Sequence, residues 1–147
     1  MKKLILILLI STSLFSSNTS DEITKLSPGL KSLLASEMVE VNKSMQKIFE
    51  SIVKADYETV AILSKKIENS FILKKSLTKI QGKELKTKVS NDFLTQDKYF
   101  HEIAGELSSA AEFENKKDIN KYFFEMTNSC VKCHSKFATH RFSNFNN

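Results

Sequence analysis

The sequence predicts an all-α protein, an antiparallel up-down-up-down four-helix bundle, and two observations support this fold class. The 147 residues include only three glycines and a single proline, whereas strands and hairpins require turn-forming residues at frequent intervals. In four segments, apolar residues recur three and four residues apart, which is the spacing of a buried helical face. Only short turns separate the first two segments and the last two, so the helices of each pair should run antiparallel.

The first helix is expected to start at Ser27-Pro28 and to run to about Lys54. Serine is a favoured N-cap, and proline is well tolerated in the first helical turn. The apolar residues alternate at spacings of four and three, which predicts one continuous inward-facing seam. This seam consists of Leu34, Met38, Val41, Met45, Ile48 and Ile52.

The second helix is expected to start at Asp56, another favoured N-cap, and to fade near Leu77. Its buried face would consist of Tyr57, Val60, Leu63 or Ala61, Ile67 and Phe71. A polar stretch follows at residues 78–90, with Gly82 inside it. We interpret this stretch as the longest link in the molecule.

The third helix should cover residues 91–113, and the fourth should start near Asp118, after a turn at residues 114–117. Their apolar faces consist of Phe93, Phe100, Ala104, Leu107 and Ala111 in the third helix and of Ile119, Tyr122, Phe123 and Met126 in the fourth. The terminal residues 143–147 are expected to be frayed.

The fourth helix leads into Cys130-Val131-Lys132-Cys133-His134, the spacing at which a c-type haem is attached. On a helix the two thiols lie three residues apart on one face, so both can form thioethers with the vinyl groups along one haem edge. His134 follows immediately and can turn its imidazole onto the iron. The motif therefore predicts one covalent haem c.

Three other kinds of site use a similar pair of cysteines. A thioredoxin-like redox pair would lie between a strand and a helix N-terminus, whereas a helical segment leads into this motif. A structural zinc site needs four ligands, and the further candidates, His101, His134, His140 and carboxylates, are not at zinc-finger spacing. A structural disulfide between the two cysteines would give the adjacent histidine no role, so its position would be a coincidence. Haem attachment uses all three motif residues.

The N-terminal residues predict export. Met1-Lys2-Lys3 is a short basic region, residues 4–10 form an unbroken aliphatic run, and residues 11–20 are mostly small and polar, as in a secretory signal peptide. The aliphatic run is too short to span a bilayer, which requires about 20 residues. An uncleaved anchor is the alternative, since Leu14 and Phe15 lengthen the apolar stretch and no Ala-x-Ala site follows.

We expect cleavage between Ser13 and Ser20, which leaves a signal peptide at residues 1–20 and a single domain at residues 21–147. Covalent haem attachment to this motif takes place outside the cytoplasm in bacteria. Both ends of the chain therefore predict a periplasmic protein, with no membrane association after cleavage.

Charge adds an expectation about partners. The chain carries a net charge of +5, and about +3 remains without the two signal-peptide lysines, which is too little to predict nucleic-acid binding. Lys121, Lys132 and Lys136 fall near one side of the last helix and could form a positive rim that guides an acidic redox partner. A solvated helix face is the alternative explanation.

The chain resembles the class II c-type cytochromes, the cytochrome c-prime group and its low-spin relatives. A signal peptide, a helical domain of this length and one haem motif at the C-terminal end carry the resemblance, which covers residues 27–142. Phe137, three residues after the motif histidine, matches an aromatic position of that family. The family usually has a basic residue directly after this aromatic, whereas this chain has Ala138 at that position and its next basic side chain of this kind, Arg141, three residues later. The resemblance implies a four-helix bundle with haem in its core. Family members are often homodimers, and the residues leave the oligomeric state open.

In that family the residue opposite the proximal histidine lies on the first helix, and it is a methionine in the low-spin members. Met38 matches this position, so the resemblance implies His134 as the proximal and Met38 as the distal iron ligand. Met45 lies about 10 Å further along the axis and is a weaker candidate, and a methionine at heptad spacing is often plain core. His101 is a second candidate for the distal iron ligand. Alternatively, His101 is a structural histidine that forms hydrogen bonds at the edge of the core.

Two functions compete. With His134 and Met38 both on the iron, the haem has no vacancy for chemistry, which suits one-electron transfer to a redox partner protein rather than an enzyme. With an open distal face, the five-coordinate haem would bind nitric oxide or carbon monoxide. A haem enzyme is the weaker third interpretation, because only His101 could serve as a distal acid-base group.

Overall fold

The computed structural model describes residues 22–70 and 77–146, and within these ranges every regular element is helical. The α-helices there are α1 (Pro28–Val53), α2 (Tyr57–Asn69), α4 (Lys79–Lys88), α5 (Asn91–Glu112) and α6 (Lys116–Phe137), with the 3-10 helices η1 (Glu22–Lys25) and η2 (Ser143–Asn146). The all-α prediction is confirmed, with five helices in the described part of the chain where four were expected. None of them is long and apolar enough to cross a membrane. The predicted signal peptide lies outside the described residues.

Local capping explains where the first two helices begin. The hydroxyl of Ser27 accepts a hydrogen bond from the backbone N–H of Leu30, and the Asp56 carboxylate accepts one from Thr59. Both predicted N-caps are therefore confirmed. The second helix ends at Asn69, earlier than expected, and residues 71–76 lie outside the described ranges.

Two features near the C-terminus differ in detail from the expectations. The last helix begins at Lys116 rather than near Asp118, because the side chain of Asn115 accepts from the backbone N–H of Asp118 and caps the helix earlier. Residues 143–146 form η2 instead of a frayed end. The N–H of Phe145 donates to the carbonyl of Phe142 at 3.1 Å, which gives this last turn an internal hydrogen bond.

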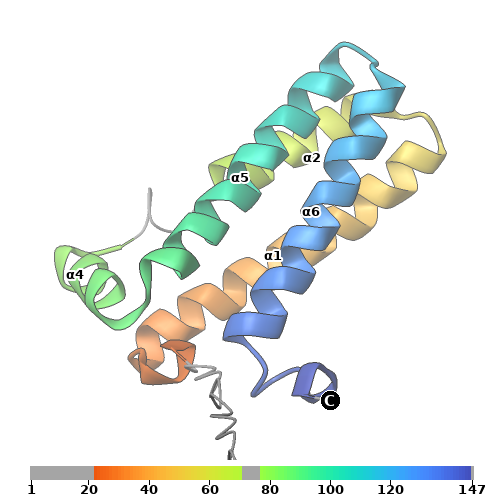
Figure 1. Ribbon diagram of the computed structural model, residues 1–147. Coiled ribbons are helices and arrows are strands. Elements are labelled where there is room, and N and C mark those ends of the chain that lie inside the picture. The colour runs from red at the N-terminus through yellow and green to blue at the C-terminus, as the bar shows by residue number, and fades with distance from the viewer. Residues whose placement is uncertain (1–21, 71–76, 147) are drawn as a thin grey trace, which may run out of the picture.

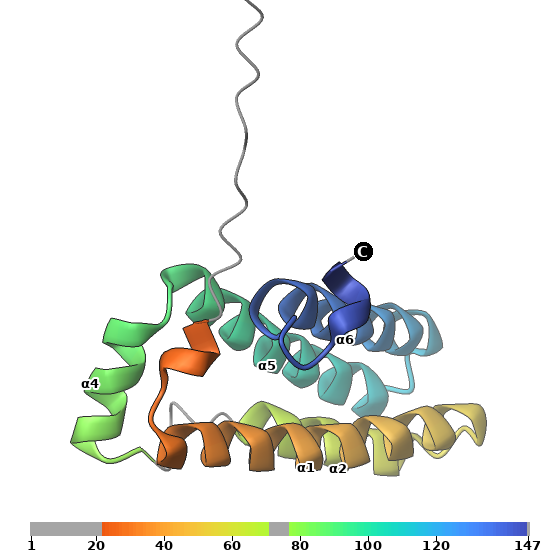
Figure 2. The same ribbon diagram turned by 90° about the horizontal axis from the view of Figure 1, so that it is seen from below.

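The four longer helices lie in two layers. α1 and α2 run antiparallel in one layer, and α5 and α6 run antiparallel in the other (Figure 1, Figure 2). Close packing joins α1 to α2, α2 to α5 and α5 to α6. The backbones of α1 and α6 approach each other at far fewer positions, although stacked Phe49 and Phe123 show that these helices are neighbours. The side between α1 and α6 is therefore the most loosely packed of the four.

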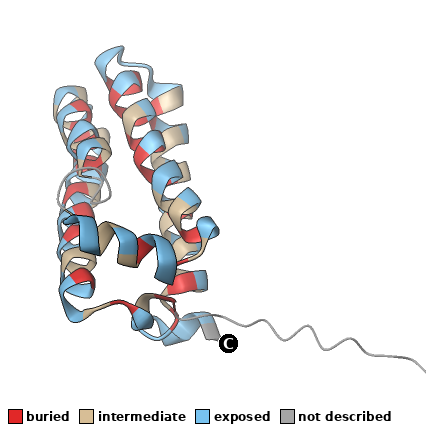
Figure 3. Ribbon diagram, turned by 90° about the vertical axis from the view of Figure 1, so that its left-hand side faces the viewer, coloured by how far each residue is buried: buried red, intermediate tan, exposed pale blue. Residues whose placement is uncertain are grey.

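One hydrophobic core fills the space between the layers. Its buried residues come from all four long helices (Figure 3). They are Val41, Ile48, Val60, Ala61, Ile67, Phe100, Ile103, Ala104, Leu107, Ala110, Ala111, Ile119 and Met126. Every apolar position predicted for the third and fourth helices is buried or half-buried, so the inward faces of these helices were predicted correctly.

The buried seam of α1 is rotated from the predicted one. Glu37 is buried, whereas Met38 beside it is 39% exposed. Ser44 is likewise buried, while Met45 is only half-buried at the core edge. The prediction that both methionines lie fully on the inward seam was therefore wrong. Close packing of α1 on α2 selects which flank of the helix is buried, and residue spacing alone cannot resolve a rotation of one position.

The predicted polar link at residues 78–90 was also wrong, because most of it forms α4. A capping box between Thr78 and Gln81 starts this helix. Leu85 is the one buried residue that α4 contributes, so the segment lacks the apolar periodicity by which the other helices were recognised. The helix packs into a second apolar cluster that consists of Leu26, Leu30, Leu85, Val89, Phe93 and Phe137.

Two carboxylates fasten this end of the molecule. Glu84 of α4 accepts from the backbone N–H of Ser27 at 2.6 Å and from its hydroxyl at 2.9 Å. Glu22 of η1 is buried and accepts from the N–H of Ser90 at 2.7 Å. These bonds join η1, α4 and the first turns of α1 and α5, which closes the second cluster against solvent.

Candidate functional site

The Cys-x-x-Cys-His motif lies near the C-terminal end of α6. The two sulfurs are not joined by a disulfide, and both cysteines are half-buried. Cys130 packs against the main core, and Cys133 packs against the second cluster. The motif therefore lies at the junction of the two apolar clusters, with its histidine one residue further along the helix.

The environment of the thiols does not suit thiol redox chemistry. Burial raises the pKa of Cys130, and burial together with the nearby charge of Asp97 raises the pKa of Cys133 to about 12. Redox-active cysteines have lowered pKa values and commonly lie at helix N-termini. In the described ranges, no three histidine, cysteine or acidic side chains are grouped to hold a metal ion, so zinc binding gains no support.

Two stacked phenylalanines show which face of α6 is turned to α1. The rings of Phe49 on α1 and Phe123 on α6 have centroids 6.1 Å apart. A helix turns by about 100° per residue, so Cys130 and His134, seven and eleven residues further on, each lie within about 20° of the direction of Phe123. The first cysteine and the histidine of the motif therefore face the α1 side of the molecule.

The same pair of rings sets the register between Met38 and His134. Met38 precedes Phe49 by eleven residues on α1, and His134 follows Phe123 by eleven on α6. Because the two helices run roughly antiparallel (Figure 1), each residue lies about 16 Å along its own helix from the stacked rings, toward the same end of the molecule. Met38 is thus level with His134 across the loosely packed side, whereas Met45 is level with Thr127.

The residues present fit a covalent haem. Thioether formation requires two unpaired thiols on one helical face, which Cys130 and Cys133 provide. A porphyrin also requires room beside that helix, and the side toward α1 is the loosely packed one. Exposed apolar side chains border it on α1, where Phe49 and Met38 are 59% and 39% exposed. Such side chains are free to cover an apolar ring system.

The motif, its orientation and the methionine opposite it are the features that bear on function. The chain matches no protein family, no curated protein and no solved structure.

His134 is held in a defined environment. Its ring stacks on that of Phe142, with centroids 4.4 Å apart and planes at 19°. Burial and the positive charge of Arg141 lower the pKa of His134. A neutral imidazole keeps the nitrogen lone pair that binds a metal, so this environment favours the ligand form of the side chain.

His101, the rival ligand, is engaged elsewhere. It is buried on α5, and its Nδ1 lies 2.7 Å from the carbonyl oxygen of Ile67. Its Nε2 faces the carboxylates of Glu37 and Asp97 at 3.7 and 3.8 Å. These contacts with α1 and α2 agree with the structural, hydrogen-bonded role considered above for His101. Met38 is therefore the better candidate for the distal position.

Asp97 should make stability depend on pH. Burial raises its pKa to about 7 from a usual value of 3.8, so the folded state binds the proton more tightly than the unfolded state. The carboxyl therefore stabilises the fold below about pH 4, and this contribution, of the order of 4 kcal/mol, is lost as the pH rises through about 7. Urea unfolding between about pH 4 and pH 8 should show this loss, and Asp97→Asn should remove most of it.

The matched control for that substitution is Asp92→Asn, because Asp92 is exposed and Lys136, 2.5 Å away, lowers its pKa. This control should keep the decline of the unfolding free energy toward neutral pH. A decline that is equally steep in Asp97→Asn would show that Asp97 does not bind the proton.

The three lysines Lys121, Lys132 and Lys136 all lie on the side of α6 that is turned away from α1. Lys121 and Lys132 lie about 160° and 180° around the helix from Phe123, on the face turned away from α1. Lys136 pairs with Asp92 at 2.5 Å. These positions favour a solvated helix face as the explanation for the three lysines.

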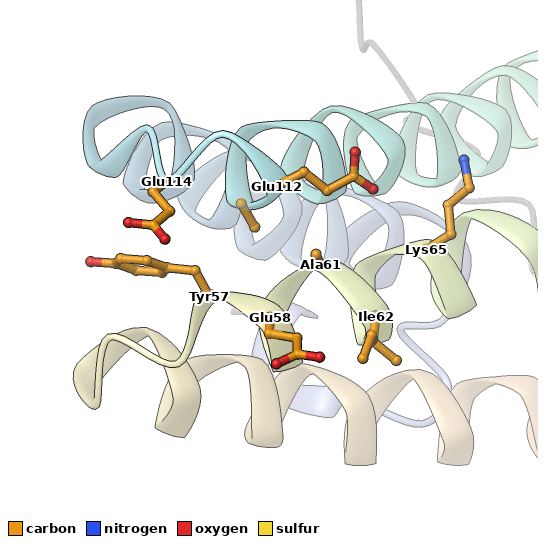
Figure 4. A pocket seen from close by; sticks show the side chains of 8 residues that line it. Tyr57, Glu58, Ala61, Ile62, Lys65, Glu112 and Glu114 are labelled. Atoms are coloured by element: carbon orange, nitrogen blue, oxygen red, sulfur yellow. The ribbon is translucent and has the colours of Figure 1, made fainter.

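Two surface depressions lie away from the motif. One, of about 470 Å³, lies between the start of α2 and the end of α5, and Glu58, Glu112 and Glu114 stand around it (Figure 4). The other, of about 590 Å³, is lined by four glutamates and two tyrosines among its residues. Neither includes a motif residue, and carboxylate-rich walls do not suit an apolar cofactor.

Sequence reasoning missed three residues around the site, Glu37, Asp97 and Phe142, and named Arg141 without foreseeing that its charge acts on His134. Asp97 and His101 are four residues apart on one helix, so their contact could have been expected from spacing. Arg141 and Phe142 carried no such signal, because a turn after α6 brings them back to the motif.

Proposed function

We propose that the chain is a periplasmic monohaem c-type cytochrome that carries single electrons. In this proposal the four long helices form the antiparallel bundle of the class II cytochromes, with one covalent haem in the core on the α1–α6 side. The observation that carries the proposal is the Cys-x-x-Cys-His motif on α6, turned toward the loosely packed side and level with Met38.

Each residue has a distinct role. Cys130 and Cys133 hold the haem by thioethers, which fixes one edge of the cofactor to α6 and to both apolar clusters. His134 is the proximal and Met38 the distal iron ligand. When bound, the haem supplies an iron that accepts and releases one electron.

The surrounding residues keep other chemistry away. Two protein ligands leave no vacant iron position for a substrate, so we propose no enzymatic activity. The two apolar clusters against which Cys130 and Cys133 pack limit the access of water to the attached edge of the haem. Histidine and methionine ligation together with burial raises the reduction potential.

A five-coordinate haem that binds nitric oxide or carbon monoxide is the alternative function. The observation that favours it is the 39% exposure of Met38, since that side chain is not locked in the core and must turn to reach the iron. An iron without this ligand would keep its distal face open.

The proposal implies a partner and a compartment. The electron must come from and go to redox partner proteins, and Arg141, whose charge acts on His134, is a contact for an acidic one. Export places the protein in the periplasm of a bacterium, because the thioethers are formed there. A homodimer through the first two helices, as in the resembling family, is part of the proposal.

The absorption spectrum of the exported protein tests the proposal. Ferric and ferrous spectra with and without carbon monoxide should show a low-spin haem that does not bind the gas. A high-spin spectrum that shifts with carbon monoxide would favour the gas-binding alternative, and an exported protein without covalent haem would overturn both.

A further inference from the structure

The segment after α6 folds back onto the motif. The N–H of Ala138 donates to the carbonyl of His134 at 3.1 Å, and the N–H groups of Arg141 and Phe142 donate to the carbonyl of Ala138 at 2.9 and 3.2 Å. This turn returns the side chain of Phe142 to His134, where the two rings stack at 4.4 Å and 19°.

The contact is not explained by core packing. Phe142 is 41% exposed, whereas Phe137 of the same chain segment is 2% exposed and packs edge-on against Phe93 in the second cluster. Phe137 therefore contributes to the core, and the described ring contact of Phe142 is with the imidazole.

The geometry leaves the imidazole able to bind. The lone pair of Nε2 lies in the plane of the ring and points away from its edge, so a ring stacked on the face does not block it. A stacked ring does restrict rotation of the imidazole about its Cβ–Cγ bond, because turning the imidazole would break the face-to-face contact.

We propose that Phe142 is a positioning residue that sets the orientation of the His134 imidazole plane at the iron. This inference rests on the proposed function, because it concerns the proximal ligand of the haem. The orientation of an axial imidazole plane affects the electronic structure of the iron, so the stacked ring affects the properties of the haem without touching it.

The test compares substitutions of Phe142 in the exported holoprotein, after covalent haem has been confirmed in each variant. In the ferric state, Phe142→Leu should shift and broaden the electron paramagnetic resonance signal relative to the wild type, and the reduction potential should shift with it. Phe142→Tyr keeps the stacked ring and should restore both. Phe145→Leu is the matched control, because Phe145 lies in the same terminal segment and is also 41% exposed.

The outcomes separate the two proposals. Haem-bearing Phe142→Leu with a wild-type resonance signal and potential would overturn the positioning role and leave the cytochrome proposal intact. An equal change in Phe145→Leu would also overturn it, since the effect would then come from the terminal segment as a whole. A wild-type protein that carries no covalent haem would overturn both proposals.

Discussion

Replacing both motif cysteines with alanine is expected to abolish covalent haem attachment. After denaturing electrophoresis, only covalently bound haem stays with the chain, so a haem stain should be present for the wild type and absent for the Cys130→Ala, Cys133→Ala double variant. Each single variant should keep one thioether and one free vinyl group. Because that vinyl group stays conjugated with the porphyrin, the pyridine haemochrome band of each single variant should move to longer wavelength.

Val131→Ala is the control for these variants. Val131 lies between the cysteines, is 48% exposed, and its truncation leaves the motif spacing unchanged, so haem content should equal that of the wild type. Covalent haem on the double variant would show that the cysteines are not the attachment points.

Replacing Met38 with alanine is expected to convert a six-coordinate haem to a five-coordinate one. The ferric spectrum should lose the weak long-wavelength band of thioether-to-iron charge transfer, and the ferrous protein should gain carbon monoxide binding. The reduction potential should fall, because an axial methionine raises it. The structural reason for this expectation is that Met38 lies on α1 at the same height as His134 on α6.

Met45→Ala separates ligation from packing. Met45 is a half-buried methionine on the same helix, about 10 Å further from the level of His134, and its loss should reduce stability without changing the iron spectrum. If Met38→Ala retains a low-spin spectrum that His101→Gln abolishes, the distal ligand is His101.

The helix bounds, which depend on residues close together in the sequence, were predicted to within about one residue for the first and third helices. The first helix was expected from Ser27-Pro28 to about Lys54 and spans Pro28–Val53, and the third was expected at residues 91–113 and spans Asn91–Glu112. N-caps and apolar spacing act within one or two turns, so the sequence alone contains them.

The sequence did not predict the helix that is held in place by only a few long-range contacts. The helix α4 buries only Leu85 fully, and it is also held by the bond of Glu84 to Ser27, more than fifty residues away. The spacing of apolar and polar residues at positions 79–88 does not predict that contact. The polar link was therefore a reasonable prediction from composition and a wrong one in three dimensions.

The sequence by itself determined the helical class, the inward faces of the last two helices and the Cys-x-x-Cys-His spacing. Only the tertiary structure decided that α1 buries Glu37 and leaves Met38 partly exposed, that the contact of Phe49 with Phe123 brings Met38 level with His134, and that Phe142 returns to stack on the imidazole. Capping and spacing act within a few residues, whereas the rotation and register of a helix depend on what it packs against. Buried Glu37 of α1, for example, faces His101 of α5, more than sixty residues away in the chain.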